Sequence, residues 1–172
     1  STTAYTTLRM IMDFEPVIIP ISPYERIFDA LEANEVDAGL IIHEGRLTFE
    51  EYGFHQIIDI GEWWSKHTGG LPLPLGGNAI KRSLGPIAIR DISALLRQSI
   101  HHALENIEES VDWLLSRKGP LDTKEKVMRY LGMYANQRTL DYGADGREAI
   151  RIFLETSFEK GLLAKAELDF AP

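Results

Sequence analysis

Short apolar runs alternate with amphipathic stretches in residues 1–70, and this alternation limits the folds that the chain can adopt. Residues 3–13 and 24–31 place their apolar side chains at helical spacing. Residues 16–21 and 36–42 are short, apolar and rich in β-branched side chains, which is typical of strands. A run as short as 36–42 fits a strand buried in a parallel sheet. The region therefore predicts an α/β unit with parallel strands.

Residues 69–77, rich in glycine, proline and leucine, interrupt this pattern. They predict a boundary between a lobe formed by residues 1–72 and a second region, residues 73–172, which consists of a crossover strand and helices. In this second region only residues 78–82 are a clear strand candidate. Its amphipathic helices need a surface on which to bury their apolar faces. We therefore expect the missing strands to come from a segment before Ser1 or from another chain.

Composition excludes several classes of function. The chain has 172 residues, 26 acidic against 18 basic side chains, a net charge of −8 and 44% hydrophobic residues. This balance fits a globular protein and offers no basic patch for nucleic acid. No run approaches the roughly 20 apolar residues that cross a bilayer. The absence of cysteine excludes disulfides and thiolate chemistry, and we expect a cytoplasmic location without nucleic-acid or membrane partners.

His43 is the first candidate for chemistry, because it follows the predicted strand 36–42 directly. Open α/β sheets bind ligands at the carboxyl ends of their strands. An imidazole there can accept a proton at neutral pH, or it can simply hydrogen bond to a neighbouring loop. Glu44 would point to the opposite side of a continuing strand, so a direct pair with His43 is not expected. The helical zinc motif is absent because Leu47 stands where its second histidine would be.

Thr2 and Thr3 stand at the start of the first predicted helix. Free backbone N–H groups and the positive end of the helix dipole suit a carboxylate or a phosphate there. The simpler interpretation is that their hydroxyl groups cap the helix. Adjacent aromatic residues such as Trp63 and Trp64 are more often one core residue and one rim residue.

Four segments, in order along the chain, resemble one enzyme family. They are GLIIHEGRLT at 39–48, GEWW at 61–64, LPLPLGGN at 71–78 and MYANQRTLDYG at 133–143. Together they resemble the 1,4-dihydroxy-6-naphthoate synthase family of the futalosine menaquinone pathway. Chorismate dehydratase shares that family's fold, but the His-Glu-Gly run favours the synthase.

The resemblance implies a fold, a reaction and a site. The fold is the periplasmic-binding-protein-like type II fold, with two lobes and the substrate between them. The reaction is a carbon–carbon lyase step that converts cyclic dehypoxanthinyl futalosine to 1,4-dihydroxy-6-naphthoate, with no metal or organic cofactor. His43 matches the family's general base, and Thr2 and Thr3 match its substrate-binding threonine pair.

The chain departs from the family in one respect. Family members carry a segment before the Thr-Thr helix that supplies strands and a ligand-binding loop of one lobe. We therefore expect a fragment, a split gene product or a cleaved chain, which is inactive alone if half of the cleft is missing. The rival interpretation is a non-catalytic binding protein of the same fold that holds a small anion. A third is that exposed helix faces bind a separate protein chain.

Overall fold

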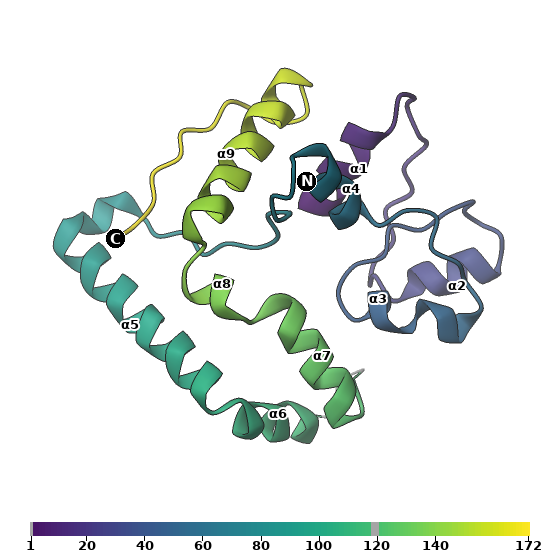
Figure 1. Ribbon diagram of the computed structural model, residues 1–172. Coiled ribbons are helices and arrows are strands. Elements are labelled where there is room, and N and C mark those ends of the chain that lie inside the picture. Colours follow the sequence, from purple (N-terminus) through teal and green to yellow (C-terminus); the bar gives the residue numbers. More distant parts are fainter. Residues whose placement is uncertain (1, 118–120) are drawn as a thin grey trace.

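Helices provide the regular structure in the part of the chain that the computed structural model describes, residues 2–117 and 121–172 (Figure 1). No β-strand occurs in these residues. The predicted α/β, periplasmic-binding-protein-like type II fold with two lobes is therefore wrong for this structure. The division of the chain near residue 72 stays a prediction.

The segments that were predicted to be strands form none in the structure. Residues 16–21 and 36–42 contain neither helix nor strand, and in the predicted strand 78–82 regular structure begins only at Arg82, with a 3-10 helix. Among the described residues, no backbone-to-backbone hydrogen bond involves 16–21 or 36–42. A strand requires a partner that satisfies its N–H and C=O groups. The strand prediction is therefore wrong, because the sequence pattern does not supply that partner.

The helices of the first half follow the sequence prediction more closely. They are α1 (Thr3–Ile11), α2 (Arg26–Glu32), α3 (Gly45–Thr48), the 3-10 helix η1 (Phe49–Tyr52) and α4 (Ile60–His67). Thr2 caps α1, because its hydroxyl oxygen accepts a hydrogen bond from the backbone N–H of Tyr5 at 3.2 Å. The second helix, expected over residues 24–31, begins later, at Arg26, and has no side-chain cap.

The second half is helical, as predicted. Its elements are η2 (Arg82–Leu84), α5 (Gly85–Glu105), α6 (Ile107–Ser116), α7 (Lys124–Tyr134), α8 (Gln137–Leu140) and α9 (Gly143–Glu159). Thr123 caps α7, because its hydroxyl oxygen accepts a hydrogen bond from the backbone N–H of Lys126 at 3.2 Å. In Figure 1, α5 runs along one edge, α6 turns the chain, and α7 to α9 return towards α4. No helix in the described residues is long and apolar enough to span a membrane.

The main core joins the two halves through Met10, Trp64 and Phe153, from α1, α4 and α9. The rings of Trp64 and Phe153 meet edge to face, with centroids 5.5 Å apart. The indole N–H of Trp64 donates to the carbonyl oxygen of Pro72 at 3.0 Å. Trp64 is fully buried and Trp63 only partly so, which confirms the expectation of one core and one rim tryptophan. This cluster anchors the irregular segment after α4 against α9.

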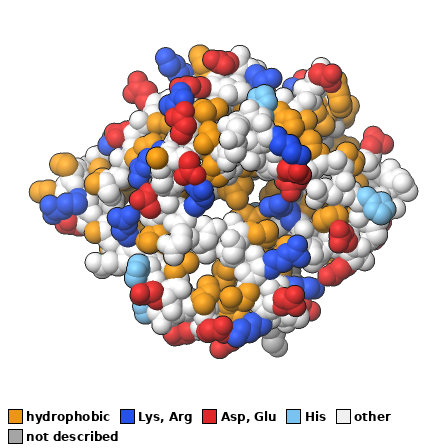
Figure 2. Space-filling model, viewed as in Figure 1, with side chains coloured by type: hydrophobic (Ala, Val, Ile, Leu, Met, Phe, Trp, Pro, Cys, Tyr) orange, Lys and Arg blue, Asp and Glu red, His pale blue; other side chains and the backbone are white. Residues whose placement is uncertain are grey.

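Much of the apolar side-chain surface is uncovered. The chain exposes 12083 Å², whereas a compact monomer of its mass exposes about 8,500 Å². The side chains of Val17 and Ile57 are 92% and 85% exposed. On α5, Ile87 and Leu95 are 69% and 66% exposed. Figure 2 shows hydrophobic side chains reaching the surface in several places on one face.

Ion pairs fix the junction between α8 and α9. The guanidinium of Arg138 donates to both carboxylate oxygens of Asp145, at 3.0 and 2.7 Å. This bonding holds the pKa of Asp145 below its ordinary value. Asp141 accepts from the backbone N–H of Gly143 and also pairs with Arg147, and both interactions lower its pKa.

We expect Trp64→Ala to reduce the free energy of unfolding by about 3–5 kcal/mol, because it empties the centre of the core and leaves the Pro72 carbonyl unpaired. Urea titration followed by circular dichroism measures the change. Trp113 is 56% exposed and provides the control, since Trp113→Ala should change the value by no more than about 0.5 kcal/mol. Equal effects of the two substitutions would contradict this description of the core.

We expect the stabilising effect of Asp145 to depend on pH. A carboxylate whose pKa is lowered by folding stabilises the native state above its unfolded pKa, and the contribution is lost as the pH falls through the folded value. The urea midpoints of the parent and Asp145→Asn should therefore differ at pH 6 and converge towards pH 3. Glu159→Gln, at an exposed position with no ion pair among the described residues, serves as the control. A difference that persists at pH 3 would contradict the assignment.

Candidate functional site

His43 lies in a turn immediately before α3, where its side chain is exposed. Its φ is 52°, in the left-handed region that few non-glycine residues adopt. Its carbonyl oxygen accepts from the N–H of Arg46 at 3.3 Å. The prediction that His43 ends a strand is wrong, because residues 36–42 form no strand.

Gly45 permits close packing beneath the turn. A Cβ atom at this position would lie 2.8 Å from Cγ2 of Ile41 and 3.3 Å from Cζ of Phe28. Phe28 of α2 in turn stacks on Tyr52 and Phe54, with centroids 4.6 and 5.9 Å away. The absence of a side chain at Gly45 therefore allows α2 and α3 to pack closely. The residue of this turn with a left-handed backbone conformation is His43.

Two tyrosine rings flank the imidazole of His43. The ring of Tyr24, just before α2, lies 5.4 Å away between centroids, and that of Tyr134, the last residue of α7, lies 6.4 Å away. Tyr130, one turn earlier on α7, packs against Tyr134 at 4.8 Å. The imidazole is thus bordered by side chains from both halves of the chain.

Glu44 bonds to Tyr24. Burial and the hydrogen bond to the Glu44 carboxylate raise the pKa of the Tyr24 hydroxyl above its ordinary value. Burial, followed by the negative charge of Glu44, also raises the pKa of Tyr130. Both phenols therefore stay protonated at neutral pH. No ion pair or hydrogen bond between the described residues joins His43 with Glu44. The effect of the Glu44 charge is instead on the pKa values of Tyr24 and Tyr130.

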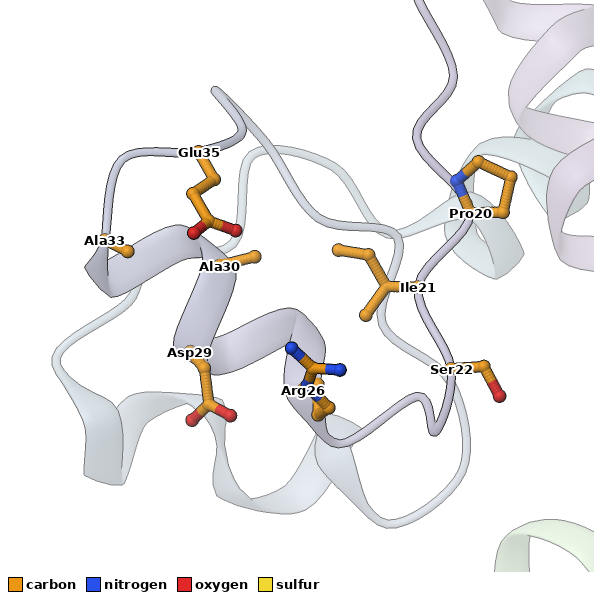
Figure 3. Close-up of a pocket in the computed structure, with 8 residues that line it drawn as sticks. All are labelled: Pro20, Ile21, Ser22, Arg26, Asp29, Ala30, Ala33 and Glu35. Carbon is orange, nitrogen blue, oxygen red and sulfur yellow. The ribbon is translucent and has the colours of Figure 1, made fainter.

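Two cavities lie close to α2. One, of about 420 Å³, has Tyr24 and Glu44 in its lining together with Lys126 of α7. The other, of about 320 Å³, lies between α2 and the segment before it, with Ile21, Arg26 and Glu35 in its lining (Figure 3). Figure 3 shows Ile21 pointing across this cavity towards α2. Neither lining includes His43, Thr2 or Thr3.

Thr2 and Thr3 lie elsewhere, at the start of α1. The hydroxyl of Thr2 caps the helix, and that of Thr3 donates to the carbonyl oxygen of Leu75 at 3.2 Å. Among the described residues, no hydrogen bond or ring contact links either threonine with His43. Both hydroxyl groups therefore have structural partners, and their role in binding a substrate stays a prediction.

The described part of the chain contains no group of three His, Cys, Asp or Glu side chains that could hold a metal ion. Two other histidines have partners of their own: His101 pairs with Glu105 at 3.0 Å, and the ring of His67 stacks on that of Trp63 with centroids 4.7 Å apart.

Sequence reasoning missed Tyr24 and the tyrosines of α7 as neighbours of His43. Tyr134 belongs to the segment 133–143 that carried the family resemblance, but nothing local links it with residue 43. Contacts between residues so far apart in the chain depend on tertiary packing. The only available signal was that Tyr134 lies within a family motif.

Comparison with known proteins identifies the family. A family model described as "Menaquinone biosynthesis" matches residues 1–159. The chain is 39% identical over 165 residues to a 1,4-dihydroxy-6-naphthoate synthase from Thermus thermophilus, covering 95% of this chain and 58% of the relative. It is 37% identical over 145 residues to the protein of that name from Streptomyces coelicolor, covering 84% of this chain and 51% of the relative.

A solved structure agrees with these matches. The X-ray crystal structure of protein AF1704 from Archaeoglobus fulgidus is 37% identical to the chain, with a TM-score of 0.84, and the match covers 94% of this chain and 60% of that one. The chain thus spans between half and three fifths of the length of these relatives. Since the family model and both curated relatives match most of the 172 residues, the chain belongs to the menaquinone biosynthesis family.

Proposed function

We propose that the chain forms part of a 1,4-dihydroxy-6-naphthoate synthase in which His43 is the general base. The observation that carries the proposal is an exposed imidazole, in a left-handed turn and flanked by two tyrosines, within a chain of this family. The substrate in this proposal is cyclic dehypoxanthinyl futalosine, and the reaction is a carbon–carbon lyase step. The setting is the cytoplasm.

His43 has the chemistry that the step requires. A neutral imidazole nitrogen accepts the proton of a substrate hydroxyl group, and the electron pair left on that oxygen forms a C=O bond as the adjacent carbon–carbon bond breaks, which opens the ring in a retro-aldol-like sense. The electron pair of the broken bond passes to the other carbon, which then takes up a proton. The base must lie within about 3 Å of the hydroxyl group. Tyr24 and Tyr130, with raised pKa values, stay neutral hydrogen-bond donors near the base. Thr2 and Thr3 bind polar groups of the substrate in this proposal.

Incubating the protein with cyclic dehypoxanthinyl futalosine and following 1,4-dihydroxy-6-naphthoate by chromatography tests the activity. The assay uses the 172-residue chain and also a family-length protein in which this chain replaces the matched part of the Thermus thermophilus relative. His43→Gln should lower kcat by about 10²-fold or more, as expected for loss of a general base. His55→Gln, at another exposed histidine, should leave turnover unchanged.

Two outcomes would contradict the proposal. Full turnover by a correctly folded His43→Gln variant would show that His43 is not the general base. Saturable binding of the substrate without product would instead favour a non-catalytic binding protein.

We also propose that additional polypeptide covers the apolar surface of the chain, and that the part of the family protein outside the match supplies it. The exposed area exceeds that of a compact monomer by roughly 3,600 Å². This excess lies in the range buried by permanent interfaces. The unpaired backbone of residues 16–21 offers hydrogen bonds to an extended segment, and its Val17 side chain is 92% exposed.

Coexpression of the chain with the unmatched segment of the Thermus thermophilus relative tests this partnership. We expect a one-to-one complex by native mass spectrometry, and we expect Val17→Lys and Ile57→Lys to weaken it because they place charge in an apolar contact. Glu109→Lys, on the exposed face of α6, is the matched control. A homodimer of the chain, or no association at all, would contradict the proposal.

A further inference from the structure

We infer that Tyr24 and Tyr134 are positioning residues that hold the imidazole of His43 between them. The inference rests on the proposed role of His43 as the base, and it concerns the residues that give this base a fixed orientation. The centroid distances of 5.4 and 6.4 Å lie within the range over which aromatic rings interact favourably. The tilts of 56° and 48° are intermediate between stacked and edge-to-face geometry.

Each of the two rings is itself held by a further side chain. Beside Tyr24 lies the carboxylate of Glu44, the residue after His43, which contributes with burial to the raised pKa of the Tyr24 hydroxyl. The ring of Tyr134 packs on Tyr130 at 4.8 Å, one turn back on α7. The contacts around the imidazole therefore continue into α7 on one side and into the turn itself on the other. On the α7 side this support belongs to a helix, which gives more precise placement than a free loop, whereas Tyr24 and Glu44 lie in turns.

The imidazole needs this support because its own turn does not confine it. His43 is exposed, and its backbone adopts a φ of 52° in the turn before α3. An exposed side chain without neighbours samples several rotamers. Neighbouring rings on two sides restrict that sampling. Since a misplacement of about 1 Å can cost a reaction about 10²-fold, confinement of this base has a direct kinetic consequence.

The two rings also make the site depend on contact between the halves of the chain. Tyr24 precedes α2 in the first half, whereas Tyr134 ends α7 in the second half. Lys126 of α7 supports the same approach, through an ion pair with Glu51 of η1 at 3.3 Å. Movement of α7 away from α3 would therefore release the imidazole without altering His43 itself.

The first experiment measures the ring contacts without requiring activity. The Hε1 proton of His43 is assigned in the 172-residue chain by comparison with His43→Gln, and its chemical shift reports the ring currents of nearby aromatic side chains. We expect Tyr134→Leu and Tyr24→Leu each to move this resonance, and Tyr134→Phe to leave it in place. Tyr142→Leu is the control, because Tyr142 contacts Phe170 and has no ring contact with His43. An unmoved Hε1 resonance in both leucine variants would overturn the inference.

The second experiment measures the kinetic consequence in the family-length protein. Tyr134→Leu should lower kcat by about tenfold to a hundredfold while KM stays within about threefold, and Tyr134→Phe should restore the rate. A purely structural role would not separate kcat from KM in this way. Parental kcat in both leucine variants, with His43→Gln inactive, would overturn the inference. An active His43→Gln variant would instead show that His43 is not the base. The Hε1 chemical shifts would still decide whether the two tyrosines hold the imidazole ring of His43.

The leucine variants require a folding control. If Tyr134→Leu loses the circular dichroism signal of its helices, the inference is tested with Tyr24→Leu and Tyr24→Phe instead. Tyr24→Phe retains the ring but loses the bond to Glu44, so its Hε1 shift should lie between those of the parent and Tyr24→Leu. A Tyr24→Phe shift identical to that of Tyr24→Leu would show that the ring contact does not position the imidazole.

Discussion

Hydrogen bonding between neighbouring backbone segments is the constraint on which the rest of this structure depends. Residues 16–21 and 36–42 have the apolar, β-branched composition of buried strands, yet neither makes a backbone-to-backbone hydrogen bond to another described residue. A helix satisfies its own N–H and C=O groups, whereas a strand cannot. The helices of the chain therefore form within it, whereas the apolar segments between them stay irregular, residues 17–20 exposed and residues 39–42 half-buried.

The difference between helix and strand also explains what could be predicted from the sequence. The cap at Thr2 and the apolar spacing of residues 3–13 are local signals, and together they correctly located α1. The α/β fold failed as a prediction because it assumed pairing partners that the residues themselves do not provide. The strand expected before His43 failed for the same reason, and His43 lies instead in a turn after an unpaired segment.

The candidate site shows the same limit. Sequence alone singled out His43, Thr2 and Thr3, yet the structure places the threonines on α1, in bonds to Tyr5 and Leu75, and the imidazole beside Tyr24 and Tyr134. The neighbours of His43 come from parts of the chain that no periodicity connects. Their identity follows from how α7 packs near α3, which is a tertiary property.

The exposure of His43 and the exposure of the apolar segments have one physical consequence in common. A base that removes a proton from a substrate works best where water is excluded, because water competes for the base and weakens the electrostatic interactions within a site. Tyr24 and Tyr134 lie beside the imidazole, but its side chain still reaches solvent. Polypeptide that pairs with the unpaired backbone of residues 16–21 would bury Val17. In the proposal, assembly and catalysis are coupled where the added polypeptide also covers the turn that holds His43.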